Sequence, residues 1–305
     1  MANVTTALAN TAGFVPQIWA QRALDYLRTQ FVMTRLIAKD TDYDAFRVGS
    51  TLTIPYPGAF TASDKAADTP LAVQVPSGGA SVSVTLNKHK AVDFIVEDVA
   101  RAQANPNLID RYAQPAIDAI AGAVEDDLFA LYSSMTGGTI GTSGTDLTDA
   151  IVRTAEKTLN DQKAPIQNRS LVVSTKDHAA LQGVSGLQNF YAWQTPEAIR
   201  DGKVTRLYGF DVYWSQRVKV VVGAPNSTKN LAIHKDAMIL ASRPFVDDMP
   251  ANAGAEQAVV VDPETGLAIR VVMQYDIANR GVRVGYDALY GVAALRPTLG
   301  VVAQA

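Results

Sequence analysis

The sequence predicts an α+β protein, and three patterns along the chain predict it. Residues 46–96 read as extended, with a run of strict apolar–polar alternation at 81–86. From residue 107 to residue 135, apolar side chains recur every three or four positions, as they do on the buried face of one long helix. Beyond residue 145, helical and extended patterns follow one another in short segments. Strands and helices therefore both contribute to the predicted core.

The composition excludes several classes of protein. The chain has 305 residues and a formal net charge of −3, which disfavours a dedicated nucleic-acid-binding protein because such proteins usually carry a strong basic excess. It has no cysteine, which excludes disulfides, thiolate nucleophiles, zinc–cysteine sites and iron–sulfur clusters. No signal peptide and no apolar run of membrane-spanning length is evident. We therefore expect a soluble protein that is made and used in a cytoplasm.

The first third of the chain is expected to be extended and poorly anchored. Residues 1–13 are small and polar and indicate a flexible arm, and an amphipathic helix is predicted from residue 16 to about residue 37. Strands follow at 51–54 and 81–86. The segment 55–70 between them is rich in Pro, Ala and Asp, which predicts the mobile tip of a long hairpin rather than part of the core.

The long helix at 107–135 is the strongest prediction. Asn107 is a suitable N-cap, and the expected length of about 29 residues is well above the average for helices. Pro115 is expected to kink the helix or to mark a short first segment. The acidic cluster 125–127 is interpreted as a solvated face, because adjacent positions point around a helix.

After the helix, a glycine-rich loop at 137–144 marks a boundary, and a mixed α/β region follows. Helices are expected at 147–161, 177–182 and 196–200, and strands at 170–174, 212–214, 218–222, 231–233, 258–261, 267–275 and 281–296.

We find no constellation of residues that predicts chemistry. None of His89, His178 and His234 has a partner at metal-ligand spacing, and a surface position is the simplest interpretation of each. The 137–144 glycines follow a helix and lack the lysine of a phosphate-binding loop, and no G-x-S-x-G elbow is present. The carboxylates of 125–127 do not converge on one side, which disfavours a magnesium site. No catalytic, cofactor or metal residue is therefore predicted.

Three blocks of sequence carry a resemblance to a known family. They are GKVTRLYGFDVYWS at 202–215, NLAIHKDAM at 230–238 followed by ASRP at 241–244, and YDALYGVAALRP at 286–297. These blocks and the order of the elements resemble the major capsid proteins of tailed bacteriophages, whose shell fold is shared with bacterial encapsulin nanocompartments. The resemblance covers essentially the whole chain. It implies the tailed-phage major capsid fold, an α+β fold with an N-terminal arm, an extended β-hairpin loop, a long spine helix, a peripheral domain and an axial domain.

The resemblance also implies how the chain is divided and what it does. The expected regions are the arm at 1–45, the extended loop at 46–96, the peripheral domain at 97–136 and 266–305, and the axial domain at 137–265. The implied function is that of a structural subunit, not an enzyme, which self-assembles into pentamers and hexamers of an icosahedral phage head around double-stranded DNA.

The implied partners are copies of the chain itself, a separate scaffolding protein, a portal, a decoration protein, and packaged DNA that is contacted without sequence preference. The implied location is the virion capsid, with assembly in the host cytoplasm. The candidate intersubunit contacts are Tyr56, Phe60 and Lys65 in the extended loop. Some members of the family cross-link subunits through a lysine in this loop, but no asparagine acceptor or buried glutamate can be assigned to Lys65, and a cross-link is not expected.

Two alternatives remain at this point. One is an encapsulin-like nanocompartment shell, which would enclose a cargo protein instead of DNA. The other is a soluble α/β enzyme or binding protein whose site has no recognisable motif. Assembly into particles separates the phage capsid and the nanocompartment shell from the soluble protein, because a soluble enzyme forms at most a small closed oligomer.

Overall fold

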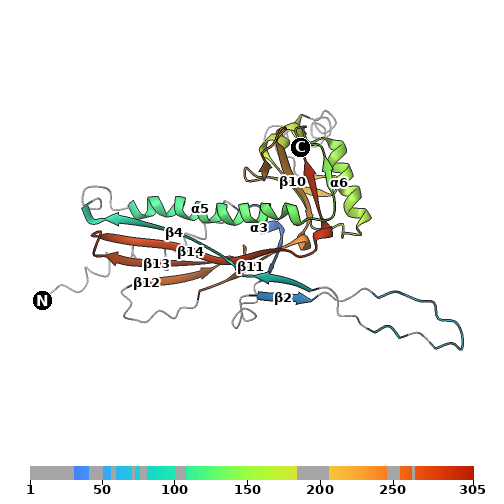
Figure 1. Ribbon diagram of the computed structural model, residues 1–305, viewed down its shortest axis with the longest axis horizontal. Coiled ribbons are helices and arrows are strands. Elements are labelled where there is room, and N and C mark those ends of the chain that lie inside the picture. The colour runs from blue at the N-terminus through green and yellow to red at the C-terminus, as the bar shows by residue number, and fades with distance from the viewer. Residues whose placement is uncertain are drawn as a thin grey trace.

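The structure is a computed structural model (Figure 1), and it describes residues 31–40, 51–55, 60–70, 73–75, 81–99, 108–183, 206–245, 255–262 and 265–305. Its strands form a six-stranded sheet, a seven-stranded sheet and a two-stranded hairpin. Long and short helices pack against the two larger sheets. The predicted α+β class is therefore confirmed.

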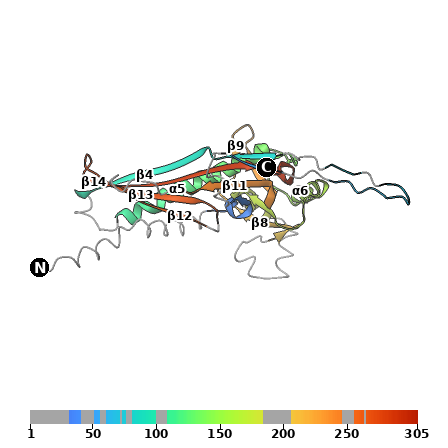
Figure 2. The ribbon, with the colours of Figure 1, turned by 90° about the horizontal axis from the view of Figure 1, so that it is seen from below.

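The six-stranded sheet is elongated, and the helix α5 runs along one of its faces (Figures 1 and 2). Its strands lie in the order β1-β11-β14-β13-β12, and β4 also pairs with β14. All pairs are antiparallel except β1 with β11. The strands are β1 (Ala38–Asp40), β4 (Lys88–Glu97), β11 (Met238–Arg243), β12 (Ala255–Val261), β13 (Ala268–Asp276) and β14 (Gly281–Ala294).

The predicted long helix is confirmed as α5 (Leu108–Ala130), which continues into the 3-10 turn η1 (Leu131–Ser134). Its buried side chains Ile117, Ile120, Val124 and Leu128 follow the spacing of three and four residues that predicted the helix. The helix passes through Pro115 without a break, so the expected short first segment does not exist. Packing against β4 and β14 along the helix stabilises it despite the backbone hydrogen bond that proline removes.

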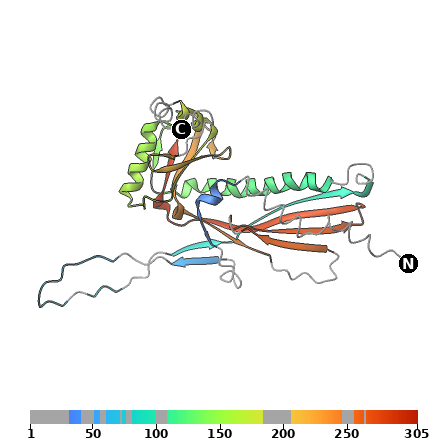
Figure 3. The ribbon, with the colours of Figure 1, turned by 180° about the vertical axis from the view of Figure 1, so that it is seen from behind.

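The seven-stranded sheet lies near the C-terminal end of α5 (Figures 1 and 3). Its order is β5-β15-β10-β6-β8-β7, with β9 paired to β10. The helices α6 (Asp149–Asp161) and α7 (Thr175–Gln182) follow β5 and β6 in the chain. The strands are β5 (Thr139–Gly141), β6 (Arg169–Val173), β7 (Arg206–Leu207), β8 (Phe210–Trp214), β9 (Val220–Val221), β10 (Ser227–His234) and β15 (Gly300–Gln304).

A buried carboxylate ties this second sheet to α7. Asp177 is fully buried, and its Oδ2 atom accepts hydrogen bonds from the Ser174 and Thr228 hydroxyls and from the Asn230 amide, each at 2.7 Å. The Ser174 hydroxyl also accepts from the Asp177 backbone N–H at 3.1 Å and caps the helix. One side chain therefore satisfies three buried donors from two elements.

The strands β2 (Thr51–Pro55) and β3 (Ser81–Thr85) form the expected hairpin, paired in antiparallel register from Thr51 with Thr85 to Pro55 with Ser81. Val84 and Leu86 pack on Ile239 and Ala241 of β11 in a small separate core. The hairpin is thus attached to the body at its base.

Sheet membership departs from the expected division at three strands. The strands β11 and β12, which lie inside the expected axial region 137–265, belong to the six-stranded sheet, and β15, inside 266–305, belongs to the seven-stranded sheet. The glycine-rich 137–144 segment is not only a loop, because β5 within it pairs in parallel with β15. These pairings join segments far apart in the chain, and local patterns do not encode them.

The other predicted helices and strands agree with the structure only in part. Of the helix expected at 16–37, the described residues contain α3 (Met33–Leu36), after which the chain turns into β1. The helix expected at 196–200 lies outside the described residues. The helices expected at 147–161 and 177–182 are confirmed as α6 and α7, and the seven strands predicted after residue 170 all have counterparts.

The interpretation of 125–127 as a solvated face is wrong for two of its three residues. Glu125 is 1% exposed, and its carboxylate accepts backbone hydrogen bonds from residues 32–34. Asp127 accepts a hydrogen bond from the Tyr290 hydroxyl at 2.6 Å and pairs with Lys88 at 2.8 Å. Only Asp126 is exposed. Residues 32–34 cover Glu125, whereas Lys88 of β4 and Tyr290 of β14 cover Asp127. Of the three side chains, only that of Asp126 is therefore open to solvent.

Candidate functional site

The first candidate surface is the end of the hairpin, which we call the projecting segment and define as the described residues 60–70 and 73–75. Every one of these residues is exposed. Figures 1 and 3 show the segment beyond the ends of β2 and β3, away from both large sheets. A segment with no described contact to its own body buries apolar surface only against another molecule.

The projecting segment carries apolar side chains in the open. Phe60 is 65% exposed, Val73 91% and Val75 83%. Of these, sequence analysis singled out Phe60 as a contact but not Val73 or Val75. The signal for these two apolar side chains was the apolar–polar–apolar alternation of residues 73–75.

Polar bonds hold the two sides of the projecting segment together. The backbone N–H of Thr61 donates to Gln74 Oε1 at 3.0 Å, and the Gln74 amide donates back to the Thr61 carbonyl. Phe60 and Val73 are each adjacent in the chain to one member of this pair. The pair therefore keeps both apolar side chains near the same level of the hairpin.

The other two candidate contact residues have different outcomes. Lys65 is described and exposed at the far part of the projecting segment. Tyr56 lies outside the described residues.

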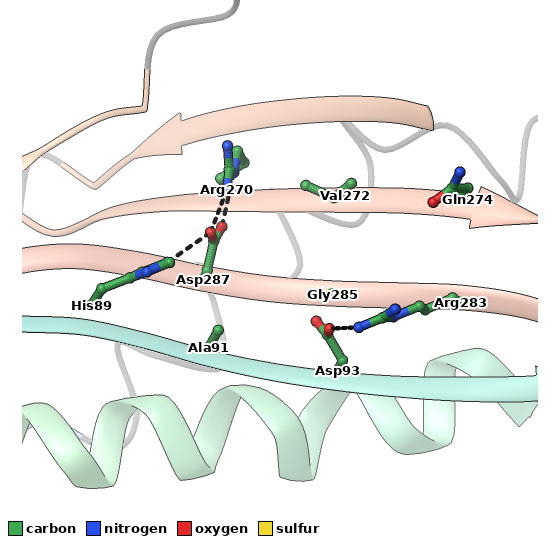
Figure 4. A pocket seen from close by; sticks show the side chains of 9 residues that line it. All are labelled: His89, Ala91, Asp93, Arg270, Val272, Gln274, Arg283, Gly285 and Asp287. Carbon is green, nitrogen blue, oxygen red and sulfur yellow. Dashed lines mark hydrogen bonds and ion pairs between the residues drawn. The ribbon is translucent and has the colours of Figure 1, made fainter. Parts of the chain in front are cut away.

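The second candidate surface is a groove on the six-stranded sheet, on the face opposite α5 (Figure 4). Alternation along β14 places Val284, Tyr286 and Ala288 in the core, and Tyr286 stacks on Phe94. The residues between them therefore face away from the helix. The groove has a volume of about 320 Å³ and is lined by His89, Ala91, Asp93, Arg270, Val272, Gln274, Arg283, Gly285 and Asp287.

Ion pairs satisfy the charged groups of this groove. The Arg270 guanidinium donates to both oxygens of Asp287, at 3.0 and 2.5 Å, and His89 Nε2 lies 3.0 Å from Asp287 Oδ2. Asp93 pairs with Arg283 across the neighbouring strands. Each carboxylate is paired with an arginine, and the residues that line the groove include no serine, threonine, cysteine or lysine that could act as a nucleophile beside them.

Sequence analysis did not identify the groove, because β4 is more than 170 residues away in the chain from β13 and β14, which supply its other residues. His89 is exposed and His178 is partly exposed, but His234 is 5% exposed and its Nδ1 atom accepts the Asp236 backbone N–H at 3.2 Å. The expectation of a surface position is therefore wrong for His234, which lies in the central strand β10.

The described part of the chain contains no assembled metal site. No group of three or more His, Cys, Asp and Glu side chains there is placed to hold an ion. Among the described helices, none combines the length and the apolar character that a bilayer crossing requires.

Comparisons with known proteins identify the fold. No protein-family model matches the sequence, and no curated protein is significantly similar to it. A chain from a structure of Mycobacterium phage Che8 is similar with a TM-score of 0.64 and 20% sequence identity, covering 90% of this chain and 91% of that chain. The capsid structure of the cyanophage P-SCSP1u matches with a TM-score of 0.63 and 13% identity, covering 89% and 87%. The virus-like particle from Pyrococcus furiosus matches with a TM-score of 0.54 and 10% identity, covering 94% and 98%.

The elongated sheet under a long helix, the second sheet at one end and the projecting hairpin thus define a shell-protein fold. More narrowly, it is the tailed-phage major capsid fold that the sequence resemblance implied, and that expectation is confirmed.

Proposed function

We propose that this chain is the major capsid protein of a tailed bacteriophage, a structural subunit that assembles into pentamers and hexamers of an icosahedral head. The observation that carries the proposal is the architecture as a whole, including a hairpin whose projecting segment is exposed throughout. In a protein that stays monomeric the apolar side chains of this segment would remain exposed to water, whereas a shell subunit buries them against a neighbour.

The candidate sites support a structural role over an enzymatic one. The groove on the six-stranded sheet is lined by paired charges, whereas small-molecule sites are mostly apolar with a few unpaired polar groups. In this proposal the groove and the projecting segment are both contact surfaces between subunits.

In this proposal we assign the domain roles by sheet. The six-stranded sheet with α5 is the peripheral domain and its spine helix, and the seven-stranded sheet with α6 and α7 is the axial domain around the centre of each capsomer. The arm at 1–45 and the extended loop at 46–96 reach to neighbouring subunits, with Tyr56, Phe60 and Lys65 as contacts.

The proposal extends to partners and location. A separate scaffolding protein guides assembly in the host cytoplasm, a portal occupies one vertex, and a decoration protein binds the finished shell of the virion. Double-stranded DNA is held inside without sequence preference, which the net charge of −3 supports because tight phosphate binding needs a basic surface.

A second candidate function is an encapsulin-like nanocompartment shell. Similarity to the virus-like particle from Pyrococcus furiosus over 94% of this chain favours it, but at a lower TM-score than the phage structures. The two functions differ in what the shell contains.

Expression of the full chain, alone and with its genetic neighbours, tests the proposal. We expect particles that sediment far ahead of the subunit and appear as closed icosahedral shells in electron micrographs. Nuclease-protected DNA inside native particles supports the phage head, and a protein cargo supports the nanocompartment. Monomers or dimers under every condition would contradict both.

A further inference from the structure

The turn that follows β8 carries an arginine that reaches across to α5. The guanidinium of Arg217 lies directly against the backbone of Gly122, where the Cβ atom of any other residue would overlap it. Its Nη1 atom also donates to Asp126 Oδ2 at 3.2 Å. A side chain from the seven-stranded sheet is therefore seated on the helix that packs on the six-stranded sheet.

Three residues of α5 form the seat for this guanidinium. Asp118, Gly122 and Asp126 are spaced by four positions, so they lie on one face of the helix with the glycine in the middle. Burial raises the pKa of Asp118 and the charge of Arg217 lowers it, which places this cation within electrostatic reach of both carboxylates.

Gly122 is the only glycine in α5. Glycine within a helix is unfavourable relative to alanine, because more backbone entropy is lost when it is ordered. The space that the guanidinium needs is a physical reason for a glycine at this position.

The turn that carries Arg217 is fixed to the seven-stranded sheet. The backbone N–H of Ser215 donates to the Val173 carbonyl of β6 at 3.0 Å, and the backbone N–H of Arg217 donates to the Ser215 hydroxyl oxygen at 3.2 Å. Ser215 and Val218, on either side of the arginine, are both buried. The position of the guanidinium therefore follows the position of the sheet.

The chain itself joins the two sheets near the C-terminal end of α5 (Figure 1). Among the described residues, the connections from η1 to β5, from β10 to β11 and from β14 to β15 pass between the sheets. These connections are hydrogen bonded to one another. The N–H of Leu295 donates to the Ala237 carbonyl at 2.9 Å, and the N–H of Thr136 donates to the Pro297 carbonyl at 3.0 Å. Together they form one compact junction.

The contact between Arg217 and Gly122 lies away from this junction. Gly122 is eight residues before the last residue of the helix, Ala130, which corresponds to about 12 Å along the helix axis. A body held at one junction can still tilt about it, and a second contact at a distance from the junction opposes that tilt.

We propose that Arg217 is a clamp that fixes the tilt of the seven-stranded sheet relative to α5, with Gly122 as its seat and Asp126 as its counter-ion. The inference concerns the conformation of a single subunit and does not depend on the proposed shell function. The side chains of Arg217 and Asp126 are 43% and 59% exposed, and an ion pair so exposed contributes little to folding stability. Loss of the clamp should therefore leave the fold intact and change the range of tilts.

The distance between two spin labels measures the tilt. The chain has no cysteine, so Gln114→Cys on α5 and Asn160→Cys on α6 introduce the only labelling sites, and both positions are exposed. Pulsed electron paramagnetic resonance on the unassembled full-length subunit gives the distribution of distances between the labels. Arg217→Met keeps an unbranched side chain but removes the guanidinium, and it should broaden this distribution. A distribution as narrow as that of the wild type would overturn the proposal.

Two controls separate a change of tilt from local damage. Arg153→Met removes an exposed arginine that pairs with Asp149 at 3.0 Å within α6, and it should keep the wild-type distribution. A second pair of labels, Asn160→Cys with Asp211→Cys, lies within the part of the chain that forms the seven-stranded sheet, and Arg217→Met should not alter its distribution. Equal broadening in either control would refute the clamp.

Substitution of the seat gives an independent test. Alanine favours a helix over glycine, so Gly122→Ala should raise the melting temperature of the Arg217→Met variant. In the chain that keeps Arg217, the added methyl group displaces the guanidinium, so the rise should be smaller and the label distribution should broaden. Equal rises in both backgrounds would show that the two residues are not coupled and would refute the role of Gly122 as the seat.

Discussion

Replacing Phe60 by alanine should leave the subunit intact and impair its assembly. Phe60 is 65% exposed, so the substitution removes little buried surface from the subunit itself. Complete truncation of a buried phenylalanine costs about 3–5 kcal/mol, and the buried third of this side chain limits the loss to about 1 kcal/mol. For comparison, Phe129 in α5 is 1% exposed, and Phe129→Ala should cost the full amount.

The effect on assembly should be larger, because the part of the ring that is exposed in the free subunit becomes buried in the assembled shell. Phenylalanine offers about 150–250 Å², so burial of the exposed fraction contributes about 3 kcal/mol per subunit at 25 cal/mol per Å². That free energy corresponds to about a 100-fold higher subunit concentration for half-maximal assembly.

The experiment pairs two measurements on each variant. Urea denaturation of the subunit gives its free energy of unfolding, and sedimentation over a range of concentrations gives the yield of particles. Ile166→Ala is the matched control, because Ile166 is 74% exposed and lies outside the hairpin. If Phe60→Ala assembles at the wild-type concentration, or if it unfolds the subunit as Phe129→Ala does, the assignment of Phe60 to an intersubunit contact is refuted.

Three further predictions concern the subunit alone. Asp177→Ala should lower the free energy of unfolding in urea by about 3–5 kcal/mol, because three buried donors lose their acceptor, whereas the exposed Asp146→Ala should change it by less than about 0.5 kcal/mol. Tyr290→Phe should cost about 1–2 kcal/mol near neutral pH through the lost bond to Asp127. Burial raises the Asp127 pKa, but the hydrogen bonds from Lys88 and Tyr290 lower it overall to below its ordinary value of 3.8. The stabilisation by these bonds is present above pH 3.8 and is lost as the pH falls through the lower pKa of the folded state. The difference in free energy of unfolding between Tyr290→Phe and wild type, measured by denaturation at a series of pH values, should therefore shrink on acidification. Gly137→Ala should lower the melting temperature, since a Cβ there would overlap the carbonyl oxygens of residues 298 and 300; an unchanged value would show that the β5–β15 junction can relax.

Much of the fold could be predicted because the spacing of apolar residues along each helix and strand reflects which face of it is buried. The helix α5 was predicted because one face of it packs on β4 and β14, and the burial of Ile120, Val124 and Leu128 repeats the sequence pattern. The strands β2 and β3 were predicted because each has one face toward a small core. The low apolar content of 55–70 likewise predicted that this part of the chain stays outside the core.

The sites were harder to predict because their partners are distant in the chain. Arg270, Asp287 and His89 meet only because β13, β14 and β4 are neighbours in one sheet. Arg270 and Asp287 lie on consecutive strands joined by a short turn, but no spacing in the sequence relates His89 to them. The same holds for β15, whose place between β5 and β10 follows from pairing across more than 60 residues.

By itself, the sequence determined the α+β class, the long helix, the hairpin and the lack of any cysteine-based chemistry, since each of these depends on neighbours in the chain or on composition. Only the tertiary structure decided that Glu125 is buried while Asp126 beside it is exposed. Both are carboxylates on one turn of one helix, and the sequence pattern treats them alike. The difference arises because residues 31–37 cover one side of α5, and a carboxylate under that cover exchanges water for backbone N–H groups.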